Sequence, residues 1–197
     1  MSTPIVRTAT TADEASVIAV TVLAFSTDPA ARWTWPDPQQ YLTHFPNFIH
    51  ALGGKAFAHG SAYCVEGYAG AALWLPPEVG PDEEVVIDLL RRTGAVAVQQ
   101  DASQVMEQMG RYHPAEPHWY LPFIGIDPPI QGKGYGAALM KHALIPCDRD
   151  QTLAYLESSN PKNIPLYERH GFELLGTIQV GASPPIFPML RKPRRPA

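Results

Sequence analysis

A strand, a glycine-rich loop and the beginning of a helix are encoded in succession by Ile124-Gly125-Ile126-Asp127-Pro128-Pro129-Ile130-Gln131-Gly132-Lys133-Gly134-Tyr135-Gly136-Ala137. Glycines allow the backbone of such a loop to approach a ligand closely. The first amides of the helix and the positive end of its dipole point at the same loop, which favours a phosphate or pyrophosphate. In a helix start with only a structural role, each glycine would cost up to about 1 kcal/mol relative to alanine. The stretch therefore predicts a phosphate-binding turn, with a plain structural turn as the alternative.

Two known nucleotide-binding motifs differ from this turn. A P-loop has Ser or Thr directly after Gly-Lys, whereas Gly134 follows Lys133 here, so that motif is excluded. The dinucleotide fingerprint G-x-G-x-x-A does fit Gly132, Gly134 and Ala137, and Glu157 could serve as its later acidic residue. That fingerprint begins at the end of its strand and opens its domain, whereas this turn follows a loop in the second half of the chain. A nucleotide-dependent oxidoreductase is therefore the less favoured reading.

Composition limits the class of protein. The chain has 197 residues, of which 45% are hydrophobic, and this is enough for one domain spanning residues 1–197. No apolar run approaches the roughly 20 residues of a membrane span, and residues 1–11 lack the apolar core of a signal peptide. Cys64 and Cys147 are far apart and form no zinc motif. We expect a cytoplasmic protein with reduced cysteines, no bound metal and no membrane contact.

The charge distribution gives little support for a nucleic-acid partner. The formal net charge is −4, which argues against a polyanion as the main ligand. A basic segment does occur near the end of the chain, Arg191-Lys192-Pro193-Arg194-Arg195. Because it is short and interrupted by proline, we expect it to be a solvated terminus.

Strands and helices are expected along the whole chain. Thr11 and Glu14 have the spacing of a capping box, and Ile18, Val22 and Phe25 would form the apolar face of the helix that follows. Further helices are expected over 39–52, 82–111 with a break near 94, 134–144 and 161–170. Strands are expected around residue 6 and over 62–66, 69–75, 118–126, 152–157, 172–180 and 186–191.

Two blocks resemble one enzyme family. Gln131-x-x-Gly134-x-Gly136 resembles the Q/R-x-x-G-x-G/A signature of the GNAT superfamily of acetyl-CoA-dependent N-acetyltransferases. The segment Glu157-Ser158-Ser159-Asn160-Pro161-Lys162-Asn163-Ile164-Pro165-Leu166-Tyr167-Glu168-Arg169-His170-Gly171-Phe172 is similar to the strand, asparagine and LYE-x-x-GF helix of that superfamily. The resemblance implies an α/β (α+β) GNAT fold, with a mixed, mostly antiparallel central sheet that has a splayed V-shaped opening and is flanked by helices.

A subgroup is also indicated. Several segments look like puromycin N-acetyltransferase and its relatives, whereas the similarity is weakest over 82–116. The segments are Ala24-Phe25, Asp28-Pro29-Ala30-Ala31-Arg32, Leu73-Trp74-Leu75-Pro76-Pro77-Glu78, the block at 161–169 and Met189-Leu190-Arg191-Lys192-Pro193.

The resemblance implies a set of contacts to acetyl-CoA. The main chain of Ile124, Gly125 and Ile126 would pair with the pantetheine arm as an added strand does. The pyrophosphate would be held by the turn, comprising Gln131, Gly132, Lys133, Gly134, Tyr135, Gly136 and Ala137. Asn160 matches the cofactor-side asparagine of the family, although Asn-Pro is also a good helix N-cap. Pro122 lies inside a strand, where it requires a bulge or an unpaired edge, and this agrees with the V-shaped opening.

The catalytic residues follow partly from the family and partly from chemistry. The tyrosine equivalent to Tyr167 sits near the thioester sulfur in the family and donates a proton to the departing thiolate. Some members have a glutamate base at the position of Tyr120, so that carboxylate is absent here. His118 would lie on the same strand face and titrates in a suitable range. His118 is therefore the predicted base, with Glu157, Glu116 or solvent as alternatives.

The acceptor side is expected between the first two helices. Aromatic residues gather there, and such rings suit a flat or partly apolar amine. Predicted acceptor-binding residues are Asp28, Trp33, Trp35 and Tyr120, whereas Phe25 and Phe45 are expected to be core. The sequence thus predicts direct acetyl transfer to the primary amine of a small molecule by a monomer or homodimer. A catalytically silent acetyl-CoA sensor and a protein or peptide N-acetyltransferase are the alternatives.

Overall fold

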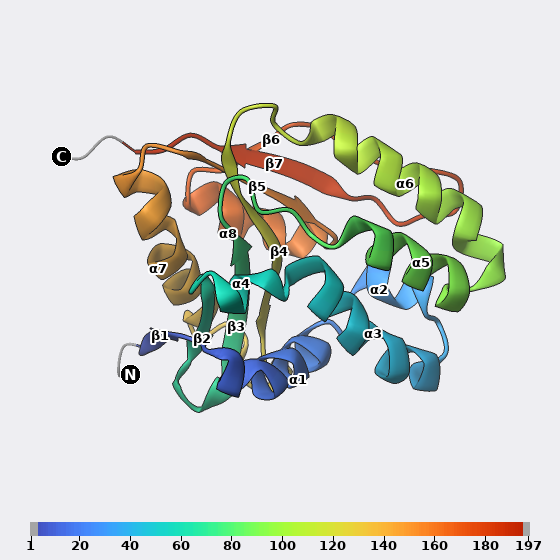
Figure 1. The fold of residues 1–197 in the computed structure, drawn as a ribbon, viewed down its shortest axis with the longest axis horizontal. Coiled ribbons are helices and arrows are strands. Elements are labelled where there is room, and N and C mark those ends of the chain that lie inside the picture. Colours follow the sequence, from blue (N-terminus) through green and yellow to red (C-terminus); the bar gives the residue numbers. More distant parts are fainter. Residues whose placement is uncertain (1–3, 195–197) are drawn as a thin grey trace.

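A seven-stranded sheet with the order β1-β2-β3-β4-β5-β7-β6 forms the centre of the computed structural model, which describes residues 4–194 (Figure 1). All neighbouring strands are antiparallel except β4 and β5, which are parallel. The mixed, mostly antiparallel sheet is therefore confirmed. The strands are β1 Val6–Thr8, β2 Ala62–Val65, β3 Gly70–Leu75, β4 His118–Ile126, β5 Leu153–Ser158, β6 Glu173–Leu174 and β7 Phe187–Arg191.

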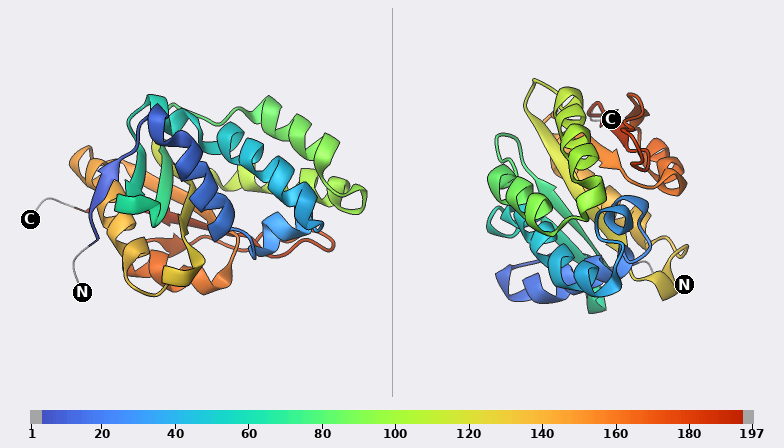
Figure 2. Two further views of the ribbon diagram at one scale, coloured as in Figure 1. Left: turned by 90° about the horizontal axis from the view of Figure 1, so that it is seen from below. Right: turned by 90° about the vertical axis from the view of Figure 1, so that its right-hand side faces the viewer.

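Helices cover both faces of this sheet (Figure 2). They are α1 Glu14–Ala24, α2 Pro29–Thr34, α3 Pro38–Gly53, α4 Lys55–Ala58, α5 Glu83–Thr93, α6 Gln99–Tyr112, α7 Tyr135–Arg149 and α8 Ile164–Arg169. Because side chains alternate along a strand, Leu73 and Tyr155 join the apolar core under α1 and α3. Trp74 and Leu156 join the core under α7 and α8 on the opposite face.

The V-shaped opening begins at Pro122. Leu73 pairs with Phe123 and Leu75 with Tyr120, so two residues of β4 lie opposite one residue of β3, which is a β-bulge at Pro122. On the other side, β4 and β5 pair only as far as Leu121 and Leu156. Beyond that point β4 continues beside β3, and β5 continues beside β7. The strands therefore separate where proline removes a backbone donor.

The first helix differs in detail from the prediction. The cap is formed one residue earlier than predicted, by Thr10 and Asp13, since the Thr10 amide donates to Asp13 Oδ2 at 2.9 Å. Val17 and Val20 are buried, whereas Ile18 and Phe25 are only partly buried. Apolar residues occur on nearly every side of α1, so their spacing does not define one face.

Two other segments also differ from their predictions. Helix α7 continues through Pro146 to Arg149, where Cys147 extends its buried face. The predicted strand over 172–180 is reduced to β6 and a single bridge between Ile178 and Ile186. The chain departs from the sheet at Gly176, where it packs so closely on the Tyr112 ring that a β-carbon would overlap it.

The basic segment near the end of the chain is not simply solvated. The Arg191 side chain is 2% exposed, and Nη2 donates to Asp148 Oδ2 at 2.9 Å while Nε donates to the His170 carbonyl at 2.8 Å. Arg194 is exposed, and Arg195 lies outside the described residues, as do residues 1–3 of the predicted N-terminal segment. Within residues 4–194, every helix is too short or too polar to cross a lipid bilayer.

Candidate active site

The predicted phosphate-binding turn is an exposed loop at the beginning of α7. Gly132 and Gly134 have φ angles of 77° and 87°, which side chains disfavour. A β-carbon at either position would meet no atom within 4 Å, so the backbone conformation requires glycine and the space around it does not. Among the residues that the structure describes, no side chain caps α7 at Gly134. The first amides of a 15-residue helix thus face an open turn, which is a suitable site for an anion.

Neighbouring residues hold this turn in place. Gln131 Nε2 donates to the Ile126 carbonyl at 3.0 Å, which ties the loop to the end of β4. Gly136 faces α8, where a β-carbon would lie 3.4 Å from Leu166 Cδ2. Tyr135 and Ala137 are partly buried at the start of α7, and Lys133 is exposed. The structure therefore brings the predicted pyrophosphate residues together at one surface.

The predicted pantetheine strand borders the opening. Ile124 pairs with Ala72 and Ile126 with Gly70 of β3, and beyond Leu121 the other edge of β4 has no ladder partner in β5. Gly125 is required by packing, because a β-carbon there would lie 2.5 Å from the Ala24 side chain in α1. The main chain of 122–126 thus keeps an unpaired edge on the side of the opening.

Tyr167 lies in α8, close to the end of β5. Its ring is buried and meets Phe172 edge-on, with centroids 6.2 Å apart. Burial, followed by the negative charge of Asp28, raises the pKa of the Tyr167 hydroxyl well above its usual value. The hydroxyl therefore stays protonated at neutral pH and is available as a donor.

Asp28 connects the cavity-side helices to the end of β5. Its Oδ1 accepts from the amides of Ala30 and Ala31 at 3.0 Å each, which caps α2. Its Oδ2 accepts from Ser159 Oγ at 2.5 Å. Burial raises the pKa of Asp28, although these hydrogen bonds oppose the shift. The carboxylate already has three donors, so its first role is to position α2 against the loop after β5.

Asn160 caps the short turn that leads to Tyr167. Its Oδ1 accepts from the Lys162 amide at 3.1 Å, and its carbonyl accepts from Ser158 Oγ at 2.9 Å. The capping role is thus confirmed, and a contact with the cofactor stays a prediction.

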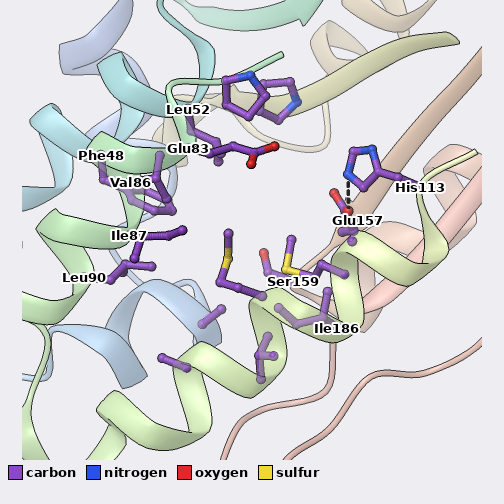
Figure 3. A pocket seen from close by; sticks show the side chains of 18 of the residues that line it. Phe48, Leu52, Glu83, Val86, Ile87, Leu90, His113, Glu157, Ser159 and Ile186 are labelled. Carbon is purple, nitrogen blue, oxygen red and sulfur yellow. Dashed lines mark ion pairs between the residues drawn. The ribbon is translucent and has the colours of Figure 1, made fainter. Parts of the chain in front are cut away.

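A cavity of about 1460 Å³ lies on the α1 and α3 face of the sheet, beside the opening. The predicted acceptor residues Asp28, Trp33, Trp35 and Tyr120 all line it, as does His118. Trp35 belongs to the wall itself, since it is buried against Phe45 and Phe48 and its Nε1 donates to Thr93 Oγ1 at 3.0 Å. Figure 3 shows the apolar part of the lining, which includes Phe48, Leu52, Val86, Ile87 and Leu90.

A polar cluster at the sheet end of this cavity joins the predicted base His118 and its alternative Glu157 through His113, which the sequence did not indicate. Glu157 lies on β5 with 3% of its side chain exposed, and its Oε1 is 3.0 Å from His113 Nε2 (Figure 3). His113 Nδ1 is 3.3 Å from His118 Nε2, and His118 Nδ1 is 2.8 Å from the Glu116 carbonyl. Burial lowers the pKa of His118. No sequence spacing indicates the contact between His113 and Glu157, because it depends on where the chain returns after α6.

Glu157 also affects the two tyrosines beneath the histidines. Burial, and then the negative charge of Glu157, raise the pKa values of Tyr120 and Tyr155.

Among residues 4–194, no three His, Cys, Asp or Glu side chains are grouped as ligands for a metal ion.

Comparison with known proteins identifies the class to which this fold and site belong. The chain matches the acetyltransferase (GNAT) family over residues 28–172, and it therefore belongs to that family. The predicted GNAT fold and acetyltransferase class are confirmed. An uncharacterised N-acetyltransferase of Schizosaccharomyces pombe is 36% identical over 78 residues, which are 38% of this chain and 32% of that protein. The match thus spans about a third of the length of this curated relative.

Solved structures resemble the chain along nearly its whole length. A Corynebacterium glutamicum protein described as a histone acetyltransferase HPA2 and related acetyltransferase has 27% identity and a TM-score of 0.70, with 99% of both chains covered. An agmatine N-acetyltransferase has 13% identity and a TM-score of 0.62, with 96% of this chain and 99% of that chain covered. A Drosophila melanogaster polyamine N-acetyltransferase has 12% identity and a TM-score of 0.61, with 96% and 100% covered. The last two likenesses concern the fold alone.

Proposed function

We propose that this protein transfers the acetyl group of acetyl-CoA directly to the primary amine of a small molecule. The observation that carries the proposal is the separation of β4 and β5 at Pro122. The glycine turn and Tyr167 belong to the α7 and α8 side of the sheet, whereas the cavity lies on the other side. Pro122, at the opening, also lines the cavity, so a thioester bound along β4 and an amine in the cavity would meet there.

The turn and the unpaired edge of β4 fit coenzyme A. Amides of 132–137 would bind the pyrophosphate, and the main chain of Ile124 and Ile126 would bind the pantetheine arm. Bound acetyl-CoA supplies an acyl group activated as a thioester. Tyr167, kept protonated by burial, would donate a hydrogen bond to the sulfur as negative charge develops on it.

The cavity supports an acceptor with a bulky, partly apolar body. Its volume of about 1460 Å³ exceeds the roughly 300–1,000 Å³ typical of small-molecule sites. Phe48, Leu90 and Met106 give apolar lining, and Glu157 and Asp28 give negative charge toward the sheet. An aminonucleoside or aromatic amine fits this arrangement, in agreement with the resemblance to puromycin N-acetyltransferase. Proteins of the same fold described as arylalkylamine and agmatine N-acetyltransferases also act on small amines.

A thiol-release assay tests the proposal. Purified protein with acetyl-CoA is given puromycin, benzylamine, spermidine, an aminoglycoside or a peptide, and free coenzyme A is measured. We expect amine-dependent release, and greater release with aromatic amines than with spermidine. Acetyl-CoA binding by calorimetry without release for any amine would instead indicate a silent sensor. Release with the peptide alone would indicate a protein or peptide N-acetyltransferase. Binding of NADPH in place of acetyl-CoA would contradict the proposal that acetyl-CoA is the cofactor.

Four properties of the whole protein stay predictions. They are a single domain over 1–197, a monomeric or homodimeric state, a cytoplasmic location and the absence of a nucleic-acid partner.

A further inference from the structure

Three contacts join Glu157 to the surface through two histidines. Glu157 Oε1 lies 3.0 Å from His113 Nε2, His113 Nδ1 lies 3.3 Å from His118 Nε2, and His118 Nδ1 lies 2.8 Å from the Glu116 carbonyl. The Glu157 side chain is 3% exposed and His113 is 30% exposed, while Glu116 is an exposed residue. The row therefore runs from the buried end of the cavity outward.

These contacts fix the number of protons on the two rings. A carbonyl only accepts, so His118 Nδ1 must carry a proton. The contact between His118 and His113 needs one further proton, on either ring. His113 Nε2 lies 3.0 Å from Glu157 Oε1, but among the described residues this carboxylate oxygen has no hydrogen-bond partner. Two neutral imidazoles, with one proton on each ring, therefore satisfy both hydrogen bonds and leave Glu157 Oε1 able to accept a proton.

The Glu157 carboxylate in this state is a base. A lone pair of His113 Nε2 and the carboxylate oxygen face each other at 3.0 Å with no hydrogen between them. Taking up a proton restores the missing hydrogen bond, which favours uptake. Other ionisable groups around the row are Tyr112 of α6, Tyr120 of β4, Tyr155 of β5 and the Glu116 carboxylate.

We propose that Glu157 accepts a proton from the ammonium group of the acceptor and that His113 and His118 carry it to the surface. This inference rests on the proposed acetyl transfer. Glu157 and Ser159 line the same cavity, and Ser159 donates to Asp28, the cap of α2, so Glu157 faces the acceptor space beside the end of β5. His118, the base predicted from the sequence, becomes the outer member of the relay and His113 its middle member.

The reaction balances with one proton released. The ammonium gives one proton to Glu157, and a proton leaves from His118 to solvent. The neutral amine nitrogen forms a bond to the acetyl carbon as the carbon–sulfur bond breaks. The second proton lost by nitrogen passes to solvent, and Tyr167, which gives its proton to the thiolate, regains one from solvent, so the products are an amide, a thiol and one solvated proton.

Two amines of similar size distinguish this relay from a structural role. Benzylamine is protonated at neutral pH, whereas aniline is not. We expect Glu157→Gln to lower kcat/KM for benzylamine by about 10²–10⁴ at pH 7, the usual range for a lost general base. The loss for aniline should be less than about tenfold, and the loss for benzylamine should shrink as the pH rises to 9. Glu173→Gln, at an exposed glutamate of β6, is the matched control and should change neither rate.

Further measurements separate this inference from the proposed function. His113→Gln should also depress the benzylamine rate and alter the acid limb of its pH profile, with acetyl-CoA binding unchanged. Equal losses for both amines at every pH, or no loss in Glu157→Gln, would overturn the relay while leaving acetyl transfer standing. If the wild type binds acetyl-CoA but acetylates neither amine, the proposed function fails instead.

Nitrogen-15 spectra of the histidine rings then test the proton count without turnover. In the wild type, His113 and His118 should titrate as a coupled pair, and Glu157→Gln should alter both titrations. Independent titration of the two rings, unaffected by Glu157→Gln, would contradict the relay.

Discussion

Gly134→Ala tests whether the turn before α7 is shaped for a ligand. Gly134 has φ of 87°, and a β-carbon there would contact no atom within 4 Å. The substitution therefore adds backbone strain without a steric overlap. A left-handed conformation costs a non-glycine residue about 1–2 kcal/mol, and this is partly offset because alanine restricts the unfolded chain. We expect a net loss of about 1 kcal/mol, which lowers Tm by about 2–4 °C in a chain of this length.

The same change should weaken coenzyme A binding. If the strained turn moves one amide out of range of the pyrophosphate, one hydrogen bond to a charged group is lost, at about 1.5–3 kcal/mol. The dissociation constant measured by calorimetry should then rise about tenfold or more.

Gly60 offers a matched control for this experiment. It has φ of 63° and equally open surroundings, but it lies between α4 and β2, away from the turn. Gly60→Ala should lower Tm by a similar amount and leave coenzyme A affinity unchanged. The reasoning is refuted if Gly134→Ala binds coenzyme A as tightly as the wild type, or if both variants lose affinity equally.

Two more predictions concern Tyr167 and the Asp148–Arg191 pair. Tyr167→Phe should reduce kcat by about 10²–10³, as for the loss of one donor to a developing anion, with little change in acetyl-CoA affinity; an unchanged kcat would exclude the role. Asp148→Asn should destabilise the fold by about 2 kcal/mol, less than the roughly 3–5 kcal/mol of a fully buried pair, because 33% of the Asp148 side chain is exposed. Burial raises the pKa of Asp148, but hydrogen bonds from Arg191 and the Arg194 amide outweigh it and lower the pKa overall. The contribution of the pair is therefore present above the unfolded carboxyl pKa of about 3.9 and is lost as the pH falls. Urea midpoints of wild type and variant should differ at pH 6 and converge toward pH 3, and a constant difference would argue against the ion pair.

Local sequence chemistry predicted the parts of the fold that depend on neighbours in the chain. The strand over 118–126 agrees with β4 residue for residue, and Pro122 lies at a bulge as its missing donor requires. The sequence failed where a distant contact decides the conformation. The predicted strand over 172–180 ends early because Gly176 packs on Tyr112 of α6, and Arg191 is buried because Asp148 of α7 neutralises it.

The residues of the candidate site also divide into those that local sequence could predict and those that distant contacts determine. The turn at Gly132 and Gly134 could be predicted because backbone with positive φ strongly favours glycine. Asp28 was predicted to bind the acceptor, whereas its cap on α2 and its bond to Ser159, 131 residues further along the chain, were not predicted. Trp35 was predicted to bind the acceptor because aromatic residues gather near it. Its indole is fixed by Phe45, Phe48 and Thr93, so it forms a wall of the cavity, and its contact with an acceptor stays a prediction.

Strand register also explains how the site can lack a carboxylate on β4. Tyr120 occupies the position at which some family members have a glutamate base, and it pairs with Tyr155 on the neighbouring parallel strand. Glu157 is two residues further along β5, so it projects on the same face as Tyr155. There it meets His113, and its charge acts on Tyr120. A carboxylate can thus reach the same part of the cavity from the adjacent strand, and its placement there depends on the register between β4 and β5.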